Sequence, residues 1–133
     1  MKKLGFLAVA AALTLVGGSA FAGDAANGEK VFKKCLACHS IDKDGKNKVG
    51  PKLFGVMGRA AGTVEGFKYG AGVSGAAAKI GAWDAAKVDE YLADPTAYLK
   101  KVSGDANAKS NMAFKLPDAK ERGDVAAYLA TQK

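Results

Sequence analysis

The feature that most constrains this chain is a five-residue motif, CLACH at positions 35–39, which ends in the only histidine of the sequence. Cys35 and Cys38 are separated by two residues, and the imidazole of His39 follows at once. At this spacing on a helix end, two thiols reach two vinyl groups of one haem, and the adjacent imidazole is aimed at its iron. The motif therefore predicts one covalently bound haem c, attached through both cysteines and ligated by His39.

Three other interpretations of this motif fit the chain less well. A thioredoxin-like dithiol needs a βαβ setting, and the sequence offers no candidate strand pair. Structural zinc needs four ligands, whereas the chain offers two cysteines and one histidine. A disulfide between Cys35 and Cys38 closes so short a loop that it stabilises weakly, and it leaves His39 unexplained.

The first 22 residues have the pattern of a secretory signal peptide. Lys2 and Lys3 give a positive start, an apolar run without charge covers 4–16, and the run ends in Ala20-Phe21-Ala22. This order predicts export to the periplasm with cleavage after Ala22. The apolar run is too short for a membrane anchor, which needs about 20 residues.

The segment 23–133 is predicted to form one domain with a modest core. Loss of the two leader lysines lowers the net charge from +7 to +5. Aromatic residues do not alternate with the lysines as in a strand-binding groove, so the composition argues against nucleic acid as a partner. The mild basic excess favours an acidic protein partner.

The hydrophobic periodicity predicts an all-α chain with long loops. Helices are expected over 28–38, 84–93 and 117–130, with a short turn over 96–99. Pro95 is expected to stop the second helix, and Pro117 to open the last one. The stretch 40–82 is rich in glycine and lysine and reads as loops, a load that is unusual unless a central group organises it.

Nearly the whole of 23–133 resembles a class I c-type cytochrome, and is most similar to the bacterial cytochrome c2 type. The matching stretches, in order along the chain, are GDAANGEKVF (23–32), the haem motif, VGPKLFG (49–55), GFKY (66–69), WD (83–84), and the tail from FKL (114–116) to AYL (127–129). The resemblance implies a small cytochrome c fold of three to five helices and long loops wrapped around one haem.

The second axial ligand is a methionine according to this resemblance. The segment 23–133 contains two, Met57 and Met112, and spacing from His39 does not choose between them. In the family the ligand comes from the loop before the last helix, which selects Met112 and leaves Met57 as a packing residue. Asn111 stands where the family often has lysine, which leaves the ligand itself intact.

The resemblance also implies a supporting shell around the haem. The carbonyl of Pro51 accepts a hydrogen bond from the ligand histidine in this family. Tyr69 and Trp83 match donors to a buried propionate, Arg59 matches an arginine near it, and Tyr91 matches a neighbour of the methionine. Without the resemblance, these residues would be interpreted as a turn proline, core aromatics and a surface charge.

Histidine and methionine together would fill both axial positions of the iron and raise its reduction potential. The predicted function is therefore a soluble monomeric electron carrier rather than an enzyme, which would exchange electrons with membrane redox complexes: a cytochrome bc1-type donor, and an oxidase or photosynthetic reaction centre as acceptor. The competing hypotheses are a haem peroxidase and a gas sensor with a labile methionine. A basic rim for docking on acidic faces is expected among Lys33, Lys34, Lys52, Lys100, Lys101, Lys109, Lys115 and Lys120.

Overall fold

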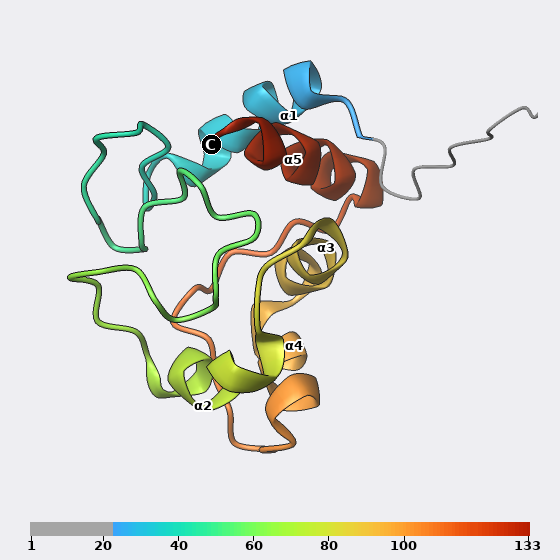
Figure 1. Cartoon of the computed structure of the whole chain (residues 1–133). Coiled ribbons are helices and arrows are strands. Elements are labelled where there is room, and N and C mark those ends of the chain that lie inside the picture. The colour runs from blue at the N-terminus through green and yellow to red at the C-terminus, as the bar shows by residue number, and fades with distance from the viewer. Residues whose placement is uncertain (1–22) are drawn as a thin grey trace, which may run out of the picture.

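The computed structural model describes residues 23–133, so the predicted signal peptide lies outside the described residues (Figure 1). Its helices are α1 (Ala25–Phe32), the 3-10 helix η1 (Lys33–Cys35), α2 (Ala71–Ile80), α3 (Ala85–Ala93), α4 (Pro95–Ser103) and α5 (Ala119–Thr131). The described part contains no strand, only one isolated bridge between Ala60 and Ala82. None of its helices is long and apolar enough to cross a membrane. The all-α prediction is confirmed.

Aspartate caps begin four of the five α-helices. The carboxylates of Asp24, Asp84, Asp94 and Asp118 each accept a hydrogen bond from the backbone N–H three residues later. Each cap satisfies an amide that has no partner inside the helix, and its charge complements the helix dipole. The exception is α2, which starts after Gly70 without a side-chain cap.

The first and last helices cross closely at one end of the molecule (Figure 1). Gly28 is buried in this crossing, and a Cβ there would lie 1.9 Å from the carbonyl oxygen of Asp124. Phe32 and Tyr128 pack beside it with ring centroids 5.4 Å apart. The missing side chain of Gly28 is therefore what lets the two backbones approach.

Two apolar clusters lie on either side of the loops. One joins α1, α3 and α5 through buried residues that include Phe32, Leu92 and Val125. The other joins α2 and α4 at the lower end of Figure 1 and centres on Ile80 and Leu99. Between them, the segment 104–118 runs back from α4 to α5.

The structure corrects three of the predicted boundaries. Helix α2 lies inside the stretch 40–82 that was predicted to be loops. Pro95 does not only stop a helix: α3 ends at Ala93, Asp94 caps both helices, and Pro95 occupies the first turn of α4, where the missing N–H costs nothing. The predicted turn over 96–99 is therefore a full helix, and the last helix begins at Ala119 rather than at Pro117.

Candidate functional site

The loops and four of the α-helices enclose a cavity of about 1010 Å³ with mostly apolar walls. That volume matches the upper end of ligand pockets in proteins, about 300–1,000 Å³. The cavity brings together residues from positions 32 to 129. All nine residues that the sequence predicts around the haem line it: Cys35, Cys38, His39, Pro51, Arg59, Tyr69, Trp83, Tyr91 and Met112.

His39 is fixed on the cavity wall by the backbone beside it. Its Nδ1 lies 2.7 Å from the carbonyl oxygen of Pro51. A carbonyl only accepts, so Nδ1 carries the proton and Nε2 keeps the lone pair that a metal needs. Burial lowers the pKa of His39 below its ordinary value, which favours the neutral ring. A Cβ on Gly50 would lie 2.3 Å from Cε1 of the imidazole, so the glycine leaves room for it.

The two cysteines reach the same wall through the turn that follows η1. The N–H groups of Cys38 and His39 both donate to the carbonyl of Cys35, at 3.1 and 2.9 Å. Both cysteines are free thiols, and burial raises the pKa of Cys35 to about 11. Within 23–133, no group of three or more metal-binding side chains forms a candidate ion site, which disfavours the structural zinc alternative.

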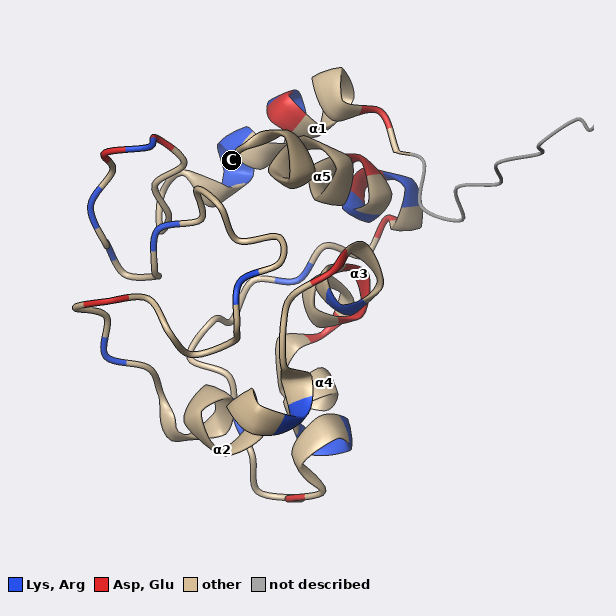
Figure 2. Ribbon diagram, in the orientation of Figure 1, with Lys and Arg blue, Asp and Glu red and all other residues tan. Residues whose placement is uncertain are grey.

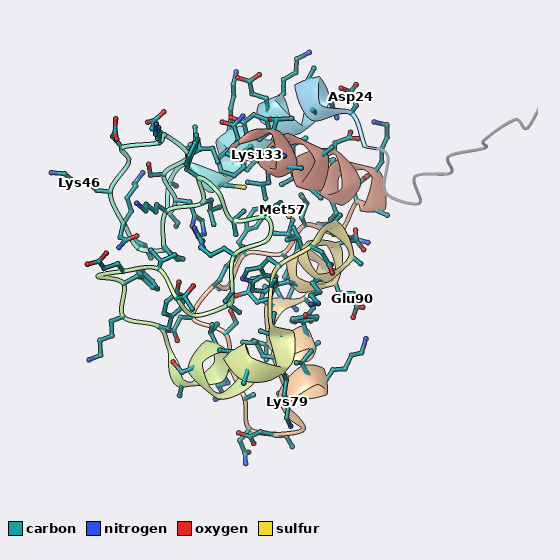
Figure 3. All side chains as sticks on the ribbon, viewed as in Figure 1. Asp24, Lys46, Met57, Lys79, Glu90 and Lys133 are labelled. Atoms are coloured by element: carbon teal, nitrogen blue, oxygen red, sulfur yellow. The ribbon has the colours of Figure 1, made fainter. Side chains whose placement is uncertain are left out.

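Met112 lies on the segment between α4 and α5 and lines the cavity together with Ala113 and Phe114. Met57 does not line the cavity, but packs against the core between α1, α3 and α5 (Figure 3). Of the methionines in the described part of the chain, Met112 is therefore the one placed to contribute a thioether to this cavity.

Three side chains supply polar groups to the wall. The guanidinium of Arg59 donates to the carbonyls of Lys52 and Phe54, at 3.1 and 3.3 Å. The hydroxyl of Tyr69 accepts the N–H of Val64 at 3.0 Å, which leaves its own proton available for another acceptor. Trp83 adds an indole N–H to the set.

Tyr91 is tied to the Met112 segment by a residue that the sequence does not single out. Its hydroxyl lies 3.1 Å from Oγ of Ser110, and Oγ also accepts the N–H of Met112 at 3.0 Å. Trp83 and Tyr98 pack around Tyr91, with ring centroids 5.3 and 5.8 Å from its own. Neither Ser110 nor Gly50 carries a sequence signal of its own, because a single serine or glycine in a loop is common.

The lysines predicted for the basic rim fall into two groups. Ion pairs occupy half of them: Lys34 with Glu121 at 3.3 Å, Lys101 with Glu90 at 2.6 Å, Lys115 with Asp94 at 2.8 Å and Lys120 with Asp124 at 2.7 Å. Two lysines that were not predicted, Lys48 and Lys68, line the cavity. Figure 2 shows that basic residues also follow the loops on the side away from α3.

The residues present fit a covalently bound haem. The cavity is large and apolar, two thiols lie on one wall, and a neutral imidazole is oriented by Pro51. Gly50 keeps the space beside that imidazole clear, which any other residue would fill. The polar groups of Arg59 and Tyr69 are of the kind that carry the propionates of a haem.

Comparison with known proteins agrees with this site. The family model described as cytochrome c matches residues 25–133. The chain is 51% identical over 111 residues to cytochrome c-550 of Novispirillum itersonii, covering 84% of this chain and all of that protein. It is 48% identical over 136 aligned positions to cytochrome c2 of Rhodospirillum rubrum, covering both chains fully.

The fold agrees as well. The structure of cytochrome c2 from Rhodospirillum centenum superposes with a TM-score of 0.79 at 45% identity, covering 84% of this chain and 99% of that one. These proteins are electron carriers with one covalently bound haem c. By its sequence, its helical fold and its cavity, the chain belongs to the cytochrome c family and is an electron carrier with one such haem.

Proposed function

We propose that the chain is exported, loses residues 1–22, and acts in the periplasm as a monomeric shuttle whose iron is held by His39 and Met112. A cytochrome bc1-type complex would be its donor, and an oxidase or photosynthetic reaction centre its acceptor. The haem, when bound through Cys35 and Cys38, supplies a reversible one-electron couple.

The observation that carries this proposal is the placement of one imidazole and one thioether on a single cavity wall system with both thiols. Two protein ligands would leave no axial position for a substrate or a gas, which favours electron transfer over peroxidase or sensor chemistry. Pro51 holds the imidazole in one tautomer, and Gly50 gives it room. The carrier function thus needs no catalytic group of its own.

The export step is supported by the start of the folded domain. Gly23 packs so closely on α5 that a Cβ there would lie 2.1 Å from the carbonyl oxygen of Gly123. The domain therefore extends to the residue that cleavage after Ala22 would leave first. The match to all of cytochrome c-550 over 111 residues fits a mature product of this length.

Two measurements test the proposal. Mass spectrometry of the periplasmic protein should give the mass of 23–133 plus one haem that resists acid–acetone extraction. The purified holoprotein should then be reduced by an isolated bc1-type complex with quinol and reoxidised by an oxidase or a reaction centre. Failure to exchange electrons with any of the three, together with rapid peroxide turnover, would instead favour the peroxidase alternative.

A further inference from the structure

We propose that Ser110 is the positioning residue for the methionine ligand, holding the Met112 loop closed through its hydroxyl. This inference rests on the proposed ligation by Met112. It concerns a hydrogen-bonded junction of three segments rather than the cavity wall itself.

The junction is built around one hydroxyl oxygen. Oγ of Ser110 accepts the N–H of Met112 at 3.0 Å and shares a hydrogen bond with the hydroxyl of Tyr91 at 3.1 Å. The backbone N–H of Ser110 donates to Oγ1 of Thr96 at 3.1 Å. A residue two positions before Met112 is therefore tied to α3 through Tyr91 and to α4 through Thr96.

The loop is also held on either side of Met112. The side chain of Asn111 packs on Gly70, where a Cβ would lie 2.5 Å from its Nδ2. After the methionine, the N–H of Leu116 donates to the carbonyl of Leu92 in α3 at 2.8 Å, and the Leu116 side chain is buried. Met112 itself thus sits on a short span between anchored ends.

The anchors differ in what they fix. Leu116 and Asn111 hold the loop by packing and one backbone bond, whereas Ser110 alone bonds the amide of Met112. Tyr91 is rigid because it packs between Trp83 and Tyr98. Losing the Ser110 hydroxyl would remove two hydrogen bonds that exist only when the loop is closed, and would favour the open loop, in which the thioether is released.

The test measures how readily imidazole binds to the ferric holoprotein, since it competes with Met112 only when the loop opens. We expect Ser110→Ala to keep the iron–thioether charge-transfer band but to raise the apparent affinity for imidazole about tenfold, the factor that two modest hydrogen bonds supply. Ser110→Thr keeps the hydroxyl and should stay within about twofold of the wild type. In a Tyr91→Phe background the Ser110→Ala effect should shrink, because one of the two bonds is already missing.

Ser103→Ala is the matched control. Oγ of Ser103 also makes two hydrogen bonds, to the carbonyl of Leu99 at 2.7 Å and from the N–H of Asp105 at 3.1 Å, but away from the cavity. It should lower stability to urea comparably without changing imidazole affinity. An equal rise in both alanine variants, or none in Ser110→Ala, overturns the positioning role. If Met112→Ala retains the band, the ligand assignment fails instead, and with it the premise of this inference.

Discussion

The carbonyl oxygen of Pro51 accepts the hydrogen bond of Nδ1 of His39 at 2.7 Å, across 12 positions of the chain. The contact fixes which ring nitrogen is protonated, and it increases the electron density that Nε2 offers to a metal. Because proline has no N–H of its own, the carbonyl at this position belongs to a segment with restricted φ. The orientation of the ligand is therefore set by backbone rather than by a mobile side chain.

Gly50 makes that orientation sensitive to one methyl group. In Gly50→Ala the new Cβ would lie 2.3 Å from Cε1 of His39, so the ring or the loop must move. We expect a loss of about 1–3 kcal/mol in the free energy of unfolding of the holoprotein, the usual cost of overpacking. Urea denaturation followed by haem absorbance measures it.

The control for this change is Gly75→Ala, in the middle of α2. No atom lies within 4 Å of a Cβ built at Gly75, so the substitution adds only helix propensity. It should stabilise the protein by about 0.5–1 kcal/mol. Equal destabilisation by the two substitutions would mean that the space beside the imidazole is not what Gly50 provides.

Asp124 should govern the acid side of the stability profile. Its buried carboxylate accepts from the N–H of Asp24 and from the side chains of Asn27 and Lys120, at 2.8, 2.6 and 2.7 Å. These contacts, that from Lys120 first, lower its pKa from 3.8 to about 2. The stabilisation is complete above the unfolded-state value and is lost as the pH falls through the folded one, so it should disappear between about pH 4 and pH 2.

Asp124→Asn tests this assignment. The variant should be less stable at neutral pH, and its stability should fall less between pH 4 and pH 2 than that of the wild type. Asp44→Asn, on the exposed loop after the haem motif, should retain the wild-type acid limb. Unfolding monitored by circular dichroism at several pH values compares the three proteins, and an unchanged acid limb in Asp124→Asn would refute the role.

Charge steering should depend on lysines at the cavity rather than on the ion-paired ones. Lys68 lines the cavity, whereas Lys79 extends from α2 at the far lower end in Figure 3, away from Lys46 and the loops. Lys68→Glu should slow reaction with an acidic redox complex at low salt by an order of about tenfold, because like charges now meet.

Stopped-flow kinetics across ionic strength check this prediction, with Lys79→Glu as the control of equal charge change. Screening shortens from about 10 Å at 0.1 M to about 3 Å at 1 M, so the variants should converge at high salt. Equal slowing by both substitutions would assign the effect to net charge, and a rate independent of salt in every protein would exclude steering.

The amphipathic helices were predictable, and the helix that failed shows why. Helix α3 carries the buried pair Val88 and Leu92 behind an aspartate cap, so pattern and cap agree. Helix α2 has two internal glycines, Gly72 and Gly75, and no side-chain cap. Its burial of Ala76 and Ile80 against α4 stabilises what local propensity does not, and such tertiary support is invisible in a sequence.

The candidate site divides along the same line. Cys35, Cys38 and His39 are adjacent in the chain, so their chemistry is legible without a fold. Met112 is separated from them by more than seventy positions, and only the resemblance chose it over Met57. Ser110 depends on where three segments meet, which no periodicity encodes.

Ligation by Met112 is the central claim, and the absorption spectrum of the ferric holoprotein tests it most directly. The wild type and Met57→Leu should both show the iron–thioether charge-transfer band at the red end of the spectrum, since a volume-conserving swap costs less than about 1.5 kcal/mol. Met112→Ala should lose the band and bind exogenous imidazole without competition, with a lower reduction potential. Loss of the band in Met57→Leu and its survival in Met112→Ala would contradict the account.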